Sequence, residues 1–163
     1  MEKRYFRSFS NPEVTNENGE VLLTYEKVPA LPTREAYEVK GKDHNRLGKI
    51  EKIRSNFGLV DLPRIVLKLD GKPTAEILKE MEAFKERYEI HSNVFSIEGS
   101  WNGPSFSILE NGSTAAIVSA LTDGENEYEI ELMDSENLAE IASIVFSIAW
   151  VFHDENVTMK ASN

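Results

Sequence analysis

Apolar and polar residues alternate along residues 91–134, in four short runs separated by Asn102-Gly103, Asn111-Gly112 and Asp123-Gly124. Asn-Gly and Asp-Gly pairs favour the positive φ angles that two-residue β-hairpin turns require. We therefore expect a four-stranded antiparallel meander in this part of the chain.

The expected pairing of these strands sorts their side chains onto two faces. With two-residue turns, Phe106 faces Ile117 and Ile117 faces Ile130, on one apolar face. Ala116 and Val118 then fall on the opposite face, among serines and glutamates. A slip of one residue would bury carboxylates and expose aromatic rings, so the pattern favours this register.

Apolar residues recur at intervals of three and four elsewhere, which predicts helices over residues 43–57, 75–89 and 135–153. The last helix is apolar over so wide an arc that it must be covered on more than one side. The sheet would cover one side. The helix at residues 75–89, the N-terminal segment or a second copy of the chain, as a homodimer, would cover another.

Alternation also predicts strands over residues 21–25, 35–40 and 64–70. From residue 64 onward the order is strand, helix, four strands, helix (β-α-β4-α). The expected fold class is a two-layer α+β domain, in which the antiparallel meander and one preceding strand carry both helices on one face.

The predicted organisation is an N-terminal β or irregular extension at residues 1–57, with a hairpin and a short basic helix, packed on an α+β core at 58–153. Residues 154–163 are expected to form a flexible tail. The element order over residues 64–153 resembles that of the TATA-box-binding-protein-like and helix-grip folds. The resemblance covers element order alone and carries no function across.

Charge is distributed unevenly along the chain, which has a net charge of −10. Residues 88–157 contain no Lys or Arg, whereas residues 1–87 hold 17 of the 18 basic residues. An acidic half of this kind repels nucleic acid and attracts a basic partner surface. The alternative is that the charge serves only solubility.

Five glutamates of the acidic half form the candidate partner-binding site. Alternate residues of a strand lie on one face about 6.8 Å apart, so the last predicted strand presents a row of carboxylates. The row would dock a basic surface, or else keep an edge strand from pairing with another chain. The five residues are Glu98, Glu125, Glu127, Glu129 and Glu131.

An apolar pocket or interface between the sheet and the last helix is the second candidate site. Its residues are aromatic and come from both elements: Phe95, Trp101, Phe106, Tyr128, Phe146 and Trp150. A pocket there would make the chain a small-molecule-binding domain.

The sequence offers little to catalysis. It contains no cysteine, which excludes disulfides, thiol nucleophiles and cysteine-ligated zinc and fits the cytoplasm. His44, His91 and His153 lie in different predicted elements, without a second ligand at metal spacing. We therefore expect no enzyme, no metal and no cofactor. No apolar run is long enough to span a membrane.

These features favour a non-enzymatic, acidic protein-binding module, such as an inhibitor, an immunity-type protein or a phage protein, that docks a basic partner surface. Direct contact with nucleic acid or with a membrane is not expected. The small-molecule-binding domain remains the alternative.

Overall fold

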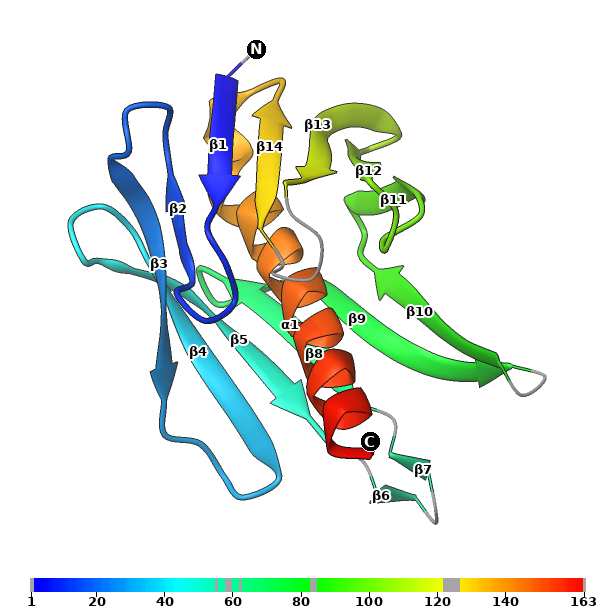
Figure 1. Ribbon diagram of the computed structural model, residues 1–163. Coiled ribbons are helices and arrows are strands. Elements are labelled where there is room, and N and C mark those ends of the chain that lie inside the picture. Colours follow the sequence, from blue (N-terminus) through cyan, green and yellow to red (C-terminus); the bar gives the residue numbers. More distant parts are fainter. Residues whose placement is uncertain are drawn as a thin grey trace.

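The computed structural model describes residues 2–54, 56–57, 60–61, 63–82, 85–121 and 127–162. In this part of the chain, twelve antiparallel strands form one curved sheet that closes almost into a barrel. A single long helix runs along the inside of the curve (Figure 1).

The strands of the large sheet are β1 (Glu2–Phe6), β2 (Glu13–Thr15), β3 (Val21–Val28), β4 (Arg34–Lys40), β5 (Arg46–Ile53), β8 (Arg64–Leu69), β9 (Lys72–Glu82), β10 (Lys85–His91), β11 (Phe95–Gly99), β12 (Ser105–Glu110), β13 (Ser113–Ala120) and β14 (Tyr128–Leu132). A separate hairpin is made by β6 (Asn56–Phe57) and β7 (Val60–Asp61). The 3-10 turn η1 (Ser135–Asn137) leads into the helix α1 (Leu138–Ser162).

Strand order in the large sheet is β10-β9-β8-β5-β4-β3-β2-β1-β14-β13-β12-β11. The first strand, β1, pairs antiparallel with the last strand, β14, and this contact joins the two halves of the chain. The two edges of the sheet are β10 and β11, which follow one another in the sequence.

The helix α1 is the centre of the hydrophobic core. Every residue from 141 to 150 is buried, because the sheet curves around a helix that is apolar on all sides. Two buried serines in this stretch keep hydrogen-bond partners. Tyr25 Oη lies 3.2 Å from Ser143 Oγ, and Ser147 Oγ donates to the Ser143 carbonyl at 2.8 Å.

The predicted two-layer α+β domain with two helices is wrong, since the structure is a sheet-dominated near-barrel with one helix. Residues 43–57 contain β5, and residues 75–82 and 85–89 belong to β9 and β10, which pair with each other. In β5, alternate residues Gly48, Ile50 and Lys52 are buried. Helix-favouring residues mislead here because tertiary packing overrides intrinsic propensity.

The resemblance in element order to the TATA-box-binding-protein-like and helix-grip folds fails for the same reason. It depended on a helix between the strand at 64–70 and the meander, and this position holds two strands. The strands predicted at 21–25, 35–40 and 64–70 are present as β3, β4 and β8.

Four antiparallel strands do follow one another from β11 to β14, but two of the predicted registers, between β12 and β13 and between β13 and β14, are wrong by one residue. Ile130 faces Val118, and Ile117 faces Glu131. A β-bulge leaves Ala115 without a partner on β12, so Phe106 faces Val118 instead of Ile117. Ala116 and Val118 are therefore buried, and Ile117 is half-buried on the outer face.

The Asn111-Gly112 turn has positive φ at both residues, 51° and 84°. The third expected turn, Asp123-Gly124, lies outside the described residues. Among the residues that are described, no helix combines the length and the apolar character needed to cross a membrane.

Candidate functional site

The glutamates of β14 lie on the outer face of the sheet, between β1 and β13. Glu131 is opposite Lys3 on one side and Ile117 on the other, and Glu129 is opposite Tyr5 and Ser119. This strand is not an edge, so its carboxylates do not serve to keep another chain from adding there.

Glu98 belongs to the same outer face. Successive cross-strand partners lead from Glu98 on β11 through Ser107 and Ile117 to Glu131 on β14. Neighbouring strands lie about 4.8 Å apart, which places these two carboxylates about 14 Å from each other across the sheet. Of the other predicted residues, Glu127 directly precedes β14 and Glu125 lies outside the described residues.

The N-terminal segment brings Lys3 and Arg7 to this face, and the Arg7 guanidinium lies 5.9 Å from the ring centroid of Tyr5. Lys3 Nζ lies 3.4 Å from Glu129 Oε1, and Tyr5 Oη lies 3.5 Å from the same atom. The charge of Glu129 and its hydrogen bond raise the pKa of Lys3 above its ordinary value. The local sequence around β14 gives no sign of this neighbour, because β1 comes from the opposite end of the chain.

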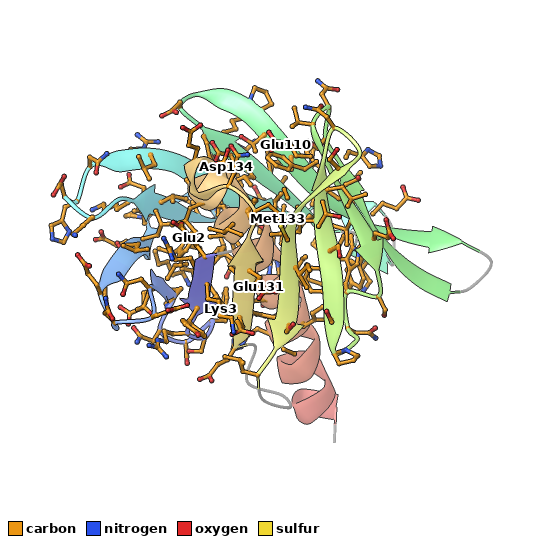
Figure 2. All side chains as sticks on the ribbon, turned by 90° about the horizontal axis from the view of Figure 1, so that it is seen from above. Glu2, Lys3, Glu110, Glu131, Met133 and Asp134 are labelled. Atoms are coloured by element: carbon orange, nitrogen blue, oxygen red, sulfur yellow. The ribbon has the colours of Figure 1, made fainter. Side chains whose placement is uncertain are left out.

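Further carboxylates gather at the end of the near-barrel where α1 begins (Figure 2). Asp134 Oδ1 accepts a hydrogen bond from the Glu136 N–H at 3.0 Å, and Glu110 accepts one from the Asn137 side chain. Met133 lies among them and is 43% exposed. This end of the molecule therefore combines negative charge with an exposed apolar side chain.

We call this region the acidic sector. It consists of Glu98, Glu110, Glu127, Glu129, Glu131 and Asp134. Within the part of the chain that the structure describes, the contact between Lys3 and Glu129 is the one ion pair in the sector.

The outer face of β3, β4, β5, β8 and β9 carries a different charge pattern, which we call the paired sector. There, acidic and basic side chains form ion pairs within or between strands: Lys40 with Glu26 at 2.5 Å, Arg46 with Glu38 at 4.0 Å, Arg34 and Lys49 with Glu51 at 3.2 Å each, and Arg64 with Glu76 at 3.7 Å. Opposite charges across strands satisfy each other locally.

The aromatic residues predicted to line a pocket do not form one lining. Phe95, Phe106, Tyr128, Phe146 and Trp150 are buried, and Trp101 is partly exposed. Trp150 contacts Phe9 and Tyr37, whereas Trp101 stacks on Tyr88 with the ring centroids 6.3 Å apart. Burial raises the pKa of Tyr128 to about 12, in keeping with its place in the core.

The predicted dimer contact through α1 involves rings that the same chain covers. Phe146 lies parallel to Tyr25 with the ring centroids 4.4 Å apart, and Phe9 stacks on Trp150 at 5.9 Å. Both α1 rings are therefore packed inside one chain.

A buried cation is the feature that sequence reasoning missed. The Lys52 side chain is 3% exposed and points into the near-barrel, whereas the basic helix predicted over residues 43–57 would place it in solvent. The sequence gives no local signal for its burial, because Lys52 interrupts the apolar alternation that Gly48 and Ile50 begin.

The histidines lie apart from one another. His153 packs on the Phe9 ring at 4.6 Å, His91 Nε2 lies 3.2 Å from Glu89 Oε2, and His44 adopts a positive φ in a turn. Across the described ranges, no group of three or more His, Asp or Glu side chains is placed to hold a metal ion.

Comparisons of the chain with protein-family models, with curated proteins and with solved structures found no match.

Proposed function

We propose that this chain is a protein-binding module whose acidic sector docks a basic surface of a protein partner. The supporting observation is the contrast between the two outer faces of one sheet. In the paired sector most charged side chains form ion pairs with one another. In the acidic sector, Glu98, Glu127 and Glu131 form no ion pair among the described residues, and Glu131 has only the longer-range charge of Lys3 beside it.

Unpaired carboxylates on a rigid sheet suit a charged partner. They are held in fixed rows by the strands, so a matching set of Lys or Arg side chains would meet them without reordering the site. Such a surface increases the association rate with a basic protein and disfavours acidic ones. This electrostatic attraction weakens as the salt concentration rises.

The residues between the carboxylates favour contact with a protein. Ser107 and Ser119 are small and leave room for long basic side chains to approach. Exposed Met133, at one end of the sector, offers an apolar anchor within a charged rim. An apolar centre with a polar rim is typical of protein interfaces.

A module of this kind acts by occupying its partner's basic surface, as an inhibitor or an immunity-type protein does. We place it in the cytoplasm, because a chain without cysteine fits a reducing compartment. The small-molecule alternative has less support, since its aromatic candidates pack against different neighbours instead of lining one site.

Zero-length carbodiimide cross-linking tests the proposal, because it joins carboxylates to lysines in direct contact. In a lysate of the cells that make the protein, we expect cross-links from Glu98, Glu127 or Glu131 to lysines of one protein. The double variant Glu127→Lys and Glu131→Lys should lose that protein.

The matched control is Glu17→Lys with Asp43→Lys, which changes the net charge equally at exposed positions outside the acidic sector. It should retain the partner. Equal loss in both variants, or cross-links confined to the paired sector, would contradict the proposal.

A further inference from the structure

Lys52 lies at the centre of a charged cluster inside the near-barrel. Its Nζ is 3.1 Å from Glu35 Oε2 on the neighbouring strand β4, and it forms a second ion pair with Asp154 of α1. The same ammonium group lies 5.4 Å from the ring centroid of Trp150. One buried cation thus contacts the sheet and the helix at once.

The cluster is stable only while its members stay together. A buried ammonium group needs paired carboxylates to replace the water that it has lost. Burial by itself would raise the pKa of Glu35, but the hydrogen bond and charge of Lys52, together with the charges of Lys27 and Arg54, outweigh it and hold that pKa below its ordinary value. Glu35 therefore pairs with Lys52 in its charged form.

A loop residue, Phe9, also packs against the part of α1 around Trp150 and His153. Phe9, from the connection between β1 and β2, stacks on Trp150 with the planes 28° apart. Phe9 also packs on His153, one residue before Asp154. Residues 150–154 of the helix are thus held by the charge cluster, by the Phe9 ring from a loop, and by strand rings, Tyr37 against Trp150 and Tyr88 against Phe152.

The rest of the helix is held differently. Residues 141–150 are buried throughout by apolar contacts, whereas residues 151–154 are half-buried. Segments with fewer buried apolar contacts open at lower free energy than the core around them. Trp150 is therefore the last fully buried residue before the half-buried part of the helix.

We propose that Lys52, Glu35 and Asp154 form a latch that keeps residues 150–154 of α1 inside the near-barrel, and that this part of the helix opens independently of residues 141–149. Opening separates Asp154 from Lys52 and moves Trp150 away from Phe9, from Tyr37 of β4 and from Lys52 of β5. The latch is a conformational device that gives access to the aromatic interior without unfolding the sheet.

Hydrogen exchange of the full chain tests the latch. In Asp154→Asn, which keeps the side-chain shape and sits at a half-buried position, we expect amides of residues 150–154 to exchange at least tenfold faster. Amides of residues 141–146 should stay within twofold of the unaltered protein. Glu35→Gln should act in the same direction, since it removes the other carboxylate of Lys52.

The matched control is Glu51→Gln on the outer face of β5, where the carboxylate pairs with Arg34 and Lys49 instead of Lys52. It should leave both helix segments unchanged. The latch is refuted if Asp154→Asn changes residues 150–154 by less than twofold. It is equally refuted if exchange rises by the same factor over residues 141–154, because the cluster would then stabilise the helix as a whole and there would be no separate opening of residues 150–154.

Discussion

Tyr25 of β3 and Phe146 of α1 lie face to face, with ring centroids 4.4 Å apart and ring planes 6° apart. The Tyr25 hydroxyl also lies 3.2 Å from Ser143 Oγ, one helical turn before Phe146. A single strand residue therefore contacts the central helix through both its ring and its hydroxyl. Phe146 in turn contacts Phe6 and Tyr37, from two other strands.

Phe146→Ala should lower the free energy of unfolding by about 3–5 kcal/mol, because it removes a fully buried ring and leaves a cavity between sheet and helix. Urea unfolding followed by circular dichroism measures the change. Leu31→Ala, in a loop where the side chain is 64% exposed, is the control and should change stability by less than about 0.5 kcal/mol. Similar losses in the two variants would contradict the central place of α1.

Gly48→Ala should destabilise the protein by about 2–3 kcal/mol, because an added methyl group overpacks the contact between β5 and β8. A Cβ at this position would lie 2.3 Å from the Lys68 carbonyl oxygen and 2.8 Å from Leu69 Cα, both of them backbone atoms. Thermal unfolding measures the effect.

The control for that change is Gly41→Ala, whose nearest neighbour is the end of the Asn45 side chain at 2.7 Å. That side chain can rotate away, so the control should cost much less. A variant at Gly48 as stable as the one at Gly41 would show that β5 and β8 do not approach so closely.

Tyr128→Phe should leave stability at pH 7 within about 1 kcal/mol, since no hydrogen bond to the Tyr128 hydroxyl is found in the described structure. Burial raises the pKa of this hydroxyl from 10.0 to about 12. Between these values the unfolded chain loses the proton while the folded protein keeps it, so stability falls as pH rises.

The variant should therefore lose less stability than the unaltered protein when urea unfolding is repeated from pH 8 to pH 11. Some pH dependence should persist, because burial also raises the pKa of Tyr25. Parallel curves for the two proteins over this range would mean that Tyr128 titrates freely.

Local alternation was enough to locate several strands, because their inward positions are uniformly apolar. β8, with Ile65, Leu67 and Leu69 buried, is the plainest case. β5 and β9 were not predicted as strands, because each places a lysine on its inward-facing side, Lys52 in β5 and Lys79 in β9. Each of these lysines lies over an aromatic ring, Trp150 and Tyr88 respectively. Such contacts are tertiary and leave no local trace.

The acidic row of β14 could also be located from the sequence, since Glu129 and Glu131 alternate with buried Ile130. The exact pairing of β14 with its neighbouring strands could not be predicted from the sequence. The pairing of β1 with β14, which brings Lys3 to Glu129, joins opposite ends of the chain. The bulge at Ala115 depends on the fit of two strands against the core and has no sequence signal comparable to the Asn-Gly turn.

The most direct measurement of the central claim is a nuclear magnetic resonance titration with a short peptide of alternating lysine and serine. The backbone amides that shift report where positive charge is received on the sheet. If the acidic sector is the docking surface, shifts will concentrate on β11 to β14 and will weaken as salt is raised from about 50 to 300 mM. Shifts centred on the paired sector of β3 to β9, or spread evenly over both faces, would contradict it.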